Sequence, residues 1–151
     1  MNHTRRDALK TTGAFASLVA MGIITQSQAH AALDRASFEV KTLADALKAL
    51  GGTPANSDQV TVIAPDIAEN GAVVPIGASS KLPNTTEIFL VVEKNPMPPA
   101  AAFTIPAGTV PEVSTRLKMG QSSNVIAVVK ADGKLYSATK ETKVTLGGCG
   151  G

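Results

Sequence analysis

Aromatic residues and cysteine are scarce in this sequence of 151 residues. It has no tryptophan and one tyrosine, and aromatic residues make up only 3% of it. The single cysteine excludes an internal disulfide framework and a Cys-x-x-Cys redox pair. No stretch approaches the roughly 18 consecutive apolar residues of a membrane span. The length suits one domain, and any chemistry in that domain depends on few reactive groups.

Neither sign of charge predominates, and histidine is nearly absent. The chain has 14 basic and 12 acidic residues, for a formal net charge of +2. This balance is too weak to direct the chain onto nucleic acid by charge alone. Both histidines, His3 and His30, lie close to the N-terminus.

The N-terminal segment has the pattern of a secretion signal. Arg5-Arg6 is followed by a mainly apolar, uncharged stretch over residues 13–24, and then by Ala29-His30-Ala31. A basic start, a short apolar middle and a small-residue exit are typical of a secretory signal. The paired arginines resemble the twin-arginine type. We therefore expect residues 1–31 to be a twin-arginine-type signal peptide that directs export to the periplasm.

Cleavage after Ala31 would remove every histidine and balance the charge. The mature residues 32–151 keep 11 of the 14 basic residues and 11 of the 12 acidic ones. Without histidine, the mature chain has no imidazole to act as a general base, to activate a nucleophile or to bind a metal. One cysteine cannot build the usual structural zinc site, and the carboxylates are scattered singly. We expect no catalytic residue, no metal and no cofactor.

The mature chain begins with the pattern of a short helix and continues with strands. Apolar residues recur at helical spacing over residues 38–50, with Ser37 as the expected N-cap and Gly51-Gly52 as the stop. We expect this helix to pack on one edge of the domain. Asn70-Gly71 and Asp132-Gly133 are turn signals, of which the first predicts a hairpin. The expected strands cover residues 60–63, 72–76, 87–93, 103–105, 112–119, 125–129 and 134–144.

About seven short strands with turns between them predict an all-β fold. Their spacing favours an immunoglobulin-like antiparallel β-sandwich over residues 32–146, preceded by the short N-terminal helix. No strands alternate with long helices, which argues against a parallel α/β sheet. Residues 95–99 are too rich in proline for a strand ladder and are expected to form an extended loop.

The only cysteine, Cys149, lies between two pairs of glycines, Gly147-Gly148 and Gly150-Gly151. Glycine adds backbone freedom and removes side-chain bulk, so we expect residues 147–151 to form a flexible arm. From Leu146, such an arm extends the thiol by about 10 Å. An unperturbed thiol has a pKa of about 8.5, and the sequence forces no cation close to this one. We infer that a partner activates Cys149, and that this chain carries a covalently bound group rather than catalysing its transfer.

Other interpretations of this ending remain open at this stage. The cysteine could form an intermolecular disulfide as a tether, or belong to a structural or redox-sensing partner subunit. Gly150-Gly151 also permits a ubiquitin-like sulfur carrier, in which a C-terminal Gly-Gly becomes a thiocarboxylate. That activation uses ATP in the cytoplasm, which conflicts with an export signal. Prenylation is disfavoured because it needs a cysteine four residues from the end.

The ending Val144–Gly151, behind a twin-arginine-like leader, resembles the SoxY family of sulfur-oxidation carrier proteins. The resemblance continues in Ile67–Gly71 and in Ala131–Tyr136, and it covers essentially the whole chain. It implies an immunoglobulin-like sandwich, and it implies a periplasmic thiosulfate-oxidising system in which Cys149 is the covalent attachment site. The strand over residues 87–93 is then either core or part of a partner interface.

The resemblance also implies partners. The first is SoxZ, a small β protein that would form a heterodimer with this chain and be exported with it. Transient complexes would follow with the c-type cytochrome SoxAX, the hydrolase SoxB and, where present, the sulfur dehydrogenase SoxCD. A tethered intermediate does not diffuse away between these enzymes, and the length of the linker sets its effective concentration at each.

Overall fold

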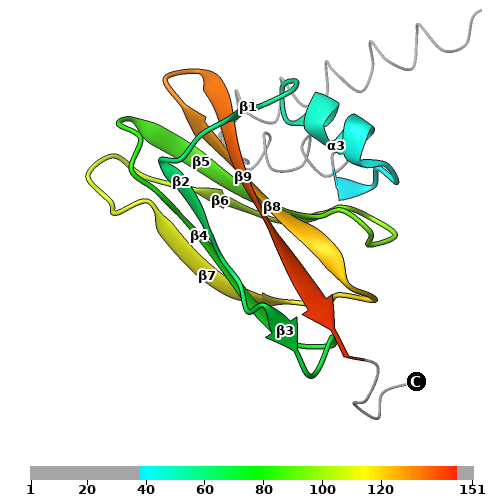
Figure 1. Cartoon of the computed structure of the whole chain (residues 1–151). Helices are drawn as coiled ribbons and strands as arrows, with labels where there is room; N and C mark the ends of the chain where they lie inside the picture. Colours follow the sequence, from blue (N-terminus) through cyan, green and yellow to red (C-terminus); the bar gives the residue numbers. More distant parts are fainter. Residues whose placement is uncertain (1–37, 146–151) are drawn as a thin grey trace, which may run out of the picture. The chain divides into compact units, whose positions relative to one another are not determined.

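Two β-sheets face each other in the computed structural model, which describes residues 38–145 (Figure 1). The larger sheet contains β1 (Ala55–Asn56), β3 (Ile67–Ala68), β5 (Thr85–Val92), β6 (Pro99–Thr104), β8 (Ser123–Ala131) and β9 (Lys134–Val144). The smaller sheet contains β2 (Val60–Ile63), β4 (Val74–Ser80) and β7 (Glu112–Leu117). Their orders are β1-β9-β8-β5-β6, with β3 paired to β9, and β2-β4-β7. The expected all-β, immunoglobulin-like sandwich is confirmed.

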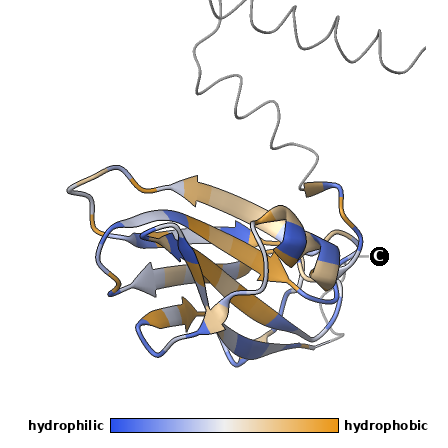
Figure 2. Ribbon diagram, turned by 90° about the horizontal axis from the view of Figure 1, so that it is seen from above, coloured by the Kyte–Doolittle hydropathy of each residue, from blue (hydrophilic) through white to orange (hydrophobic). Residues whose placement is uncertain are grey.

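The main core lies between the two sheets because apolar side chains alternate along the strands. In β2, Val60 and Val62 are buried, while the residues between and after them are exposed. This period of two places alternate side chains on opposite faces of a sheet. Hydrophobic residues accordingly run along the strands of both sheets (Figure 2).

The centre of the larger sheet is buried on both faces. On β5, Leu90 belongs to the core between the sheets, and its neighbour Val91 belongs to a second apolar cluster on the outer face. Both are fully buried. The near-continuous apolar run over residues 87–93 is therefore part of the core. The sequence alone leaves open whether this run is core or part of a partner interface.

Helix α3 (Leu43–Ala49) accounts for that second cluster. Its Leu43 and Leu47 pack, together with Leu50, against the outer-face side chains of Val91 and Val128. The expected short helix is thus present, but it covers a sheet face rather than an edge of the domain. Burial of outward-facing apolar residues on β5 and β8 requires such a cover, because a sheet with two apolar faces needs a layer on each side.

The ends of α3 are fixed by local hydrogen bonds. The hydroxyl of Thr42 accepts a bond of 3.1 Å from the Asp45 N–H, which makes Thr42 the N-cap. The expected cap, Ser37, lies outside the described residues. At the other end, Gly51 and Gly52 adopt φ angles of 120° and 127°, so the expected glycine stop is confirmed.

The Asn70-Gly71 turn does not form the predicted hairpin. Asn70 Oδ1 accepts a bond of 2.9 Å from the Ala72 N–H, so a turn is present. However, the strands on its two sides belong to different sheets, because β3 pairs with β9 and β4 pairs with β2 and β7. The turn carries the chain from one sheet to the other.

Two short strands depart from the antiparallel pattern. Both β1 and β3 pair parallel to β9 and have two residues each, which is too short to give a periodic signal. A further difference is that β6 begins at Pro99, inside the segment expected to be a loop. Proline is tolerated there because β6 is an edge strand, where one side of the backbone needs no partner.

Candidate functional site

The residues that the sequence identifies as the functional site lie outside the described residues. These are Cys149 and its flanking glycines Gly147, Gly148, Gly150 and Gly151. The described structure ends at Thr145, four positions before the cysteine. The candidate site is therefore built from the residues that hold this end of β9.

Strand β3 holds the end of β9 from one side. Their parallel register pairs Ile67 with Lys143 and Ala68 with Val144. The Thr145 N–H donates a bond of 3.1 Å to the Ala68 carbonyl, one residue beyond the last residue of β9. The last described residue is thus tied to the sandwich by its backbone.

Ser122 holds the same end from the other side. Its hydroxyl oxygen accepts a bond of 2.9 Å from the Val144 N–H. The hydroxyl also lies 3.4 Å from the Val144 carbonyl oxygen, to which it donates. The regular pairing of β8 with β9 begins only at Ser123 and Thr142, so Ser122 extends the anchoring of β9 beyond the ladder.

Gly71 packs closely against the anchored end of β9. Its carbonyl accepts a bond of 2.7 Å from the Met119 N–H. A Cβ on Gly71 would lie 2.5 Å from the Met119 carbonyl oxygen and 2.8 Å from a Val144 methyl carbon. Distances of this size are well inside van der Waals contact, so only glycine allows the loop before β4 to approach Val144 so closely.

Lys140 is engaged by partners within the sandwich. Its Nζ donates a bond of 2.6 Å to the Ala64 carbonyl and forms an ion pair of 3.0 Å with Asp66. Lys143, on the same strand, is exposed. Lys140 therefore already has both a hydrogen-bond acceptor and an ion-pair partner within the sandwich.

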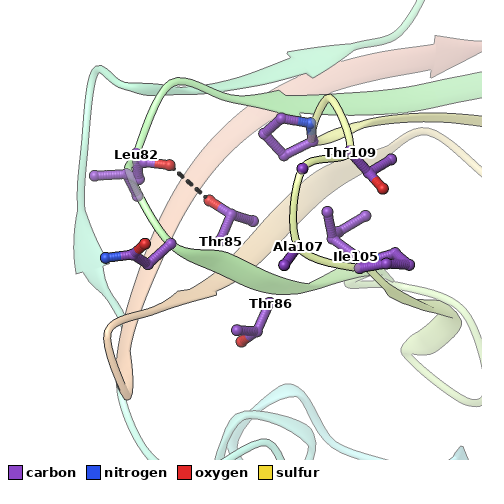
Figure 3. Close-up of a pocket in the computed structure, with 10 residues that line it drawn as sticks. Leu82, Thr85, Thr86, Ile105, Ala107 and Thr109 are labelled. Atoms are coloured by element: carbon purple, nitrogen blue, oxygen red, sulfur yellow. Dashed lines mark hydrogen bonds between the residues drawn. The ribbon is translucent and has the colours of Figure 1, made fainter.

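A pocket of about 320 Å³ lies at the other end of the sandwich, between the β4–β5 turn and the β6–β7 connection (Figure 3). Leu82 and Ile105 contribute apolar side chains to it, and Thr85 and Thr109 contribute hydroxyls. The Thr85 hydroxyl already donates to the Leu82 carbonyl at 2.9 Å. No titratable side chain lines this pocket, so it supplies no acid, base or nucleophile.

The described residues also contain no obvious catalytic or metal centre. Within residues 38–145, no three His, Cys, Asp or Glu side chains gather in a way that could hold a metal ion. Over the same residues, no buried side-chain nitrogen or oxygen lacks a hydrogen-bond partner. None of the helices in this part of the chain is long and apolar enough to cross a membrane.

An immunoglobulin-like sandwich whose last strand leads into a glycine-flanked cysteine is the architecture of a carrier protein. The family of the sulfur oxidation protein SoxY matches residues 46–149. This chain belongs to the SoxY family, and it is a sulfur carrier subunit of the Sox system rather than an enzyme. Membership also implies partnership with SoxZ and with the Sox system in general.

A solved structure supports this assignment. The sulfur carrier protein SoxY from Chlorobium limicola f thiosulfatophilum is 39% identical to this chain, with a TM-score of 0.63. The match covers 70% of this chain and 97% of that one. A search of curated proteins found no match.

Sequence reasoning found the cysteine but missed the residues that anchor β9 before it. Ser122 gives no signal in the sequence, because a serine beside a strand is common and its partner is 22 positions away. Ile67 and Ala68 have no strand signal of their own and stand out in the sequence only through the resemblance to the SoxY family. Their pairing with β9 depends on a long-range contact that no local pattern encodes.

Proposed function

We propose that the sulfur carried by this protein is bound covalently to the Sγ atom of Cys149, at the end of a glycine arm formed by residues 147–151. The observation that carries this proposal is that the match to the SoxY family extends to residue 149, which is the only cysteine in the sequence. The anchoring of Val144 and Thr145 supports it, because the arm then has a fixed starting point.

The loading step joins the thiol to thiosulfate by oxidation. A bond forms between Cys149 Sγ and the outer sulfur of thiosulfate, the thiol proton leaves, and two electrons pass to an oxidant. In this proposal the oxidant is the c-type cytochrome complex SoxAX. Hydrolysis by SoxB then cleaves the bond between the bound sulfur and the sulfone with water, which releases sulfate and one proton and leaves a protonated persulfide (–SSH) on Cys149. Where SoxCD is present, it oxidises that persulfide sulfur.

The carrier needs a partner to activate its thiol. The thiolate is the reactive form, and a lowered pKa requires a cation or a helix N-terminus nearby. Lys140 is paired with Asp66 and bonded to the Ala64 carbonyl, so it does not serve this purpose. We therefore assign the activating charge to the enzyme that receives the arm, because Lys140 is engaged within the sandwich.

We also propose that residues 1–31 are a twin-arginine-type signal peptide, and that the carrier acts in the periplasm as a heterodimer with SoxZ. Arg5-Arg6, the apolar stretch and Ala29-His30-Ala31 support the export step. Twin-arginine export moves folded proteins, so a partner without its own signal would be exported already bound to this chain.

Intact-mass spectrometry tests the attachment site. The mature protein, paired with SoxZ, is incubated with thiosulfate and the cytochrome complex, and a thiosulfonate adduct is expected on the native chain. Cys149→Ser should give no adduct, while Val110→Ser, an exposed position on the β6–β7 connection, keeps the thiol and should still be loaded. An adduct on the Cys149→Ser protein would refute the proposal and would favour a carrier that uses another group, such as a C-terminal thiocarboxylate.

A further inference from the structure

The distance between the anchored end of β9 and the cysteine limits how far the thiol can move. The backbone of Thr145 is bonded to Ala68, and Val144 is bonded to Ser122. Cys149 lies four residues further on, so its Cα reaches at most about 14 Å from that of Thr145, even in a fully extended chain. An enzyme that encloses the Cys149 thiol in its active site must therefore bring its own surface close to Thr145.

Three loops at the end of the sandwich where β9 finishes are linked by hydrogen bonds. In loop 69–73, the Gly71 carbonyl accepts a hydrogen bond of 2.7 Å from the Met119 N–H, which joins this loop to loop 118–122. Loop 118–122 is joined to loop 93–98 through Asn95, whose Nδ2 donates to the Lys118 carbonyl at 2.8 Å. With Ile67 of β3, these loops make up what we refer to as the arm-root face, at the end of the sandwich where β9 finishes (Figure 1).

The elements that make up this face carry three exposed apolar side chains. Ile67, Val73 and Met97 are 59%, 50% and 53% exposed, and they are three of the five large hydrophobic side chains that are exposed in residues 38–145. Single exposed hydrophobic residues are ordinary, so what matters is the location of these three at the same end of the sandwich. The backbone of Ile67 is fixed by its pairing with Lys143, so this side chain is presented in a defined position.

Charged side chains accompany the apolar ones. Glu69, Lys94 and Lys118 are all exposed and lie on the same three loops. Apolar contacts with polar residues beside them are the usual arrangement of a protein interface. Three half-exposed side chains offer only a small apolar area, which suits an interface that forms and dissociates during each cycle rather than a permanent one.

We propose that the arm-root face is the surface on which a partner enzyme docks while Cys149 occupies its active site, and that Ile67, Val73 and Met97 contact an apolar collar around the entrance of that enzyme's channel. This inference rests on the proposed role of Cys149. It further requires the stable SoxZ-type subunit to bind elsewhere on the sandwich, because a permanent partner on this face would keep enzymes away from the thiol.

The first test compares matched surface variants in a steady-state assay. Thiosulfate-dependent reduction of the cytochrome complex is measured while the concentration of the mature carrier, paired with SoxZ, is varied. Replacing Ile67, Val73 and Met97 together by serine should raise the KM for the carrier by about tenfold and change kcat by less than about twofold. The control is Val110→Ser, at the other end of the sandwich, which removes an even more exposed side chain (74%) and should leave both constants unchanged.

The second test lengthens the arm. Insertion of four glycines between Leu146 and Gly147 adds about 13–14 Å of reach, so an enzyme no longer has to touch the arm-root face. The same triple substitution should then raise the KM much less than it does with the native arm. A purely structural effect of the three substitutions would not depend on arm length, so this comparison isolates docking.

Three outcomes would overturn the inference. The triple variant could behave like Val110→Ser, its defect could be independent of arm length, or it could fail to bind SoxZ in size-exclusion chromatography. The last result would make this face a subunit interface. The proposed function is tested separately by Cys149→Ser. If that variant is not loaded but the triple variant is loaded normally, only the docking inference fails.

Discussion

The hydroxyl of Ser122 and the backbone of Val144 form a two-way contact, in which Oγ accepts from the N–H at 2.9 Å and donates to the carbonyl at 3.4 Å. This contact replaces a strand partner at the point where β8 ends its pairing with β9. Together with the pairing of β3, it holds the two residues of β9 that follow Thr142, the last residue that pairs with β8.

Substitution of Ser122 by alanine should loosen the end of β9. The variant loses a part-buried hydrogen bond, which costs about 0.5–1.5 kcal/mol in the free energy of unfolding. Hydrogen exchange should show faster exchange of the Val144 amide than in the native protein. Ser114→Ala, on the exposed outer face of β7, is the control and should change neither quantity measurably. Unchanged exchange at Val144 in the Ser122→Ala protein would show that the hydroxyl does not anchor the strand.

Gly71 should tolerate no side chain, in contrast to a glycine close to it. A Cβ at Gly71 would lie 2.5 Å from the Met119 carbonyl oxygen, so Gly71→Ala should destabilise the fold by about 1–3 kcal/mol in chemical denaturation. A Cβ at Gly120 would meet nothing within 4 Å, and Gly120→Ala should be neutral or slightly stabilising. Equal stabilities of the two variants would mean that the loop before β4 can move away from Val144 at little cost.

The sequence predicts the long strands well because their periodicity reports burial directly. The apolar run over residues 125–129 predicts a buried strand, and β8 packs against the core on one face and against the cluster under α3 on the other. Asp132-Gly133 predicts the turn into β9, and both residues adopt the positive φ angles, 50° and 72°, of that turn. In these places local preference and the packed structure favour the same conformation.

The sequence fails where a segment owes its structure to distant partners. Ile67 and Ala68 form a strand only because β9 lies beside them, and two residues cannot display a period. Asn70-Gly71 has the composition of a hairpin turn, but the strand before it pairs with the other sheet. The sequence identified Cys149 by its composition alone, whereas the anchor that limits its reach, through Ala68 and Ser122, is visible only in three dimensions.

A hydrogen bond between two turns should contribute to stability at the end of the sandwich away from Thr145. Asn84 and Asp132 both adopt left-handed φ angles, 54° and 50°, and Asn84 Nδ2 donates to Asp132 Oδ1 at 2.9 Å. Asp132→Ala removes this bond and places alanine in a conformation that it disfavours, at a cost of about 1–2 kcal/mol. Asp132→Asn keeps both the acceptor oxygen and the tolerance for a left-handed φ, and it should retain most of the stability. A thermal melt of the two variants checks this, and an equal loss in both would assign the effect to the charge of Asp132 instead.

Export should depend on the paired arginines and should set the N-terminus of the carrier. If residues 1–31 are a twin-arginine-type signal, replacement of both Arg5 and Arg6 by lysine keeps the positive charge and should still prevent export, because recognition of the pair is specific to arginine. Cell fractionation and intact-mass measurement should then find the full-length chain in the cytoplasm, whereas the native chain should be periplasmic and begin at Ala32. The matched control is Lys10→Arg, which changes a basic residue outside the pair and should leave export unaffected. Normal export of the double lysine variant would exclude the twin-arginine route, and a shorter or longer mature mass would move the cleavage site.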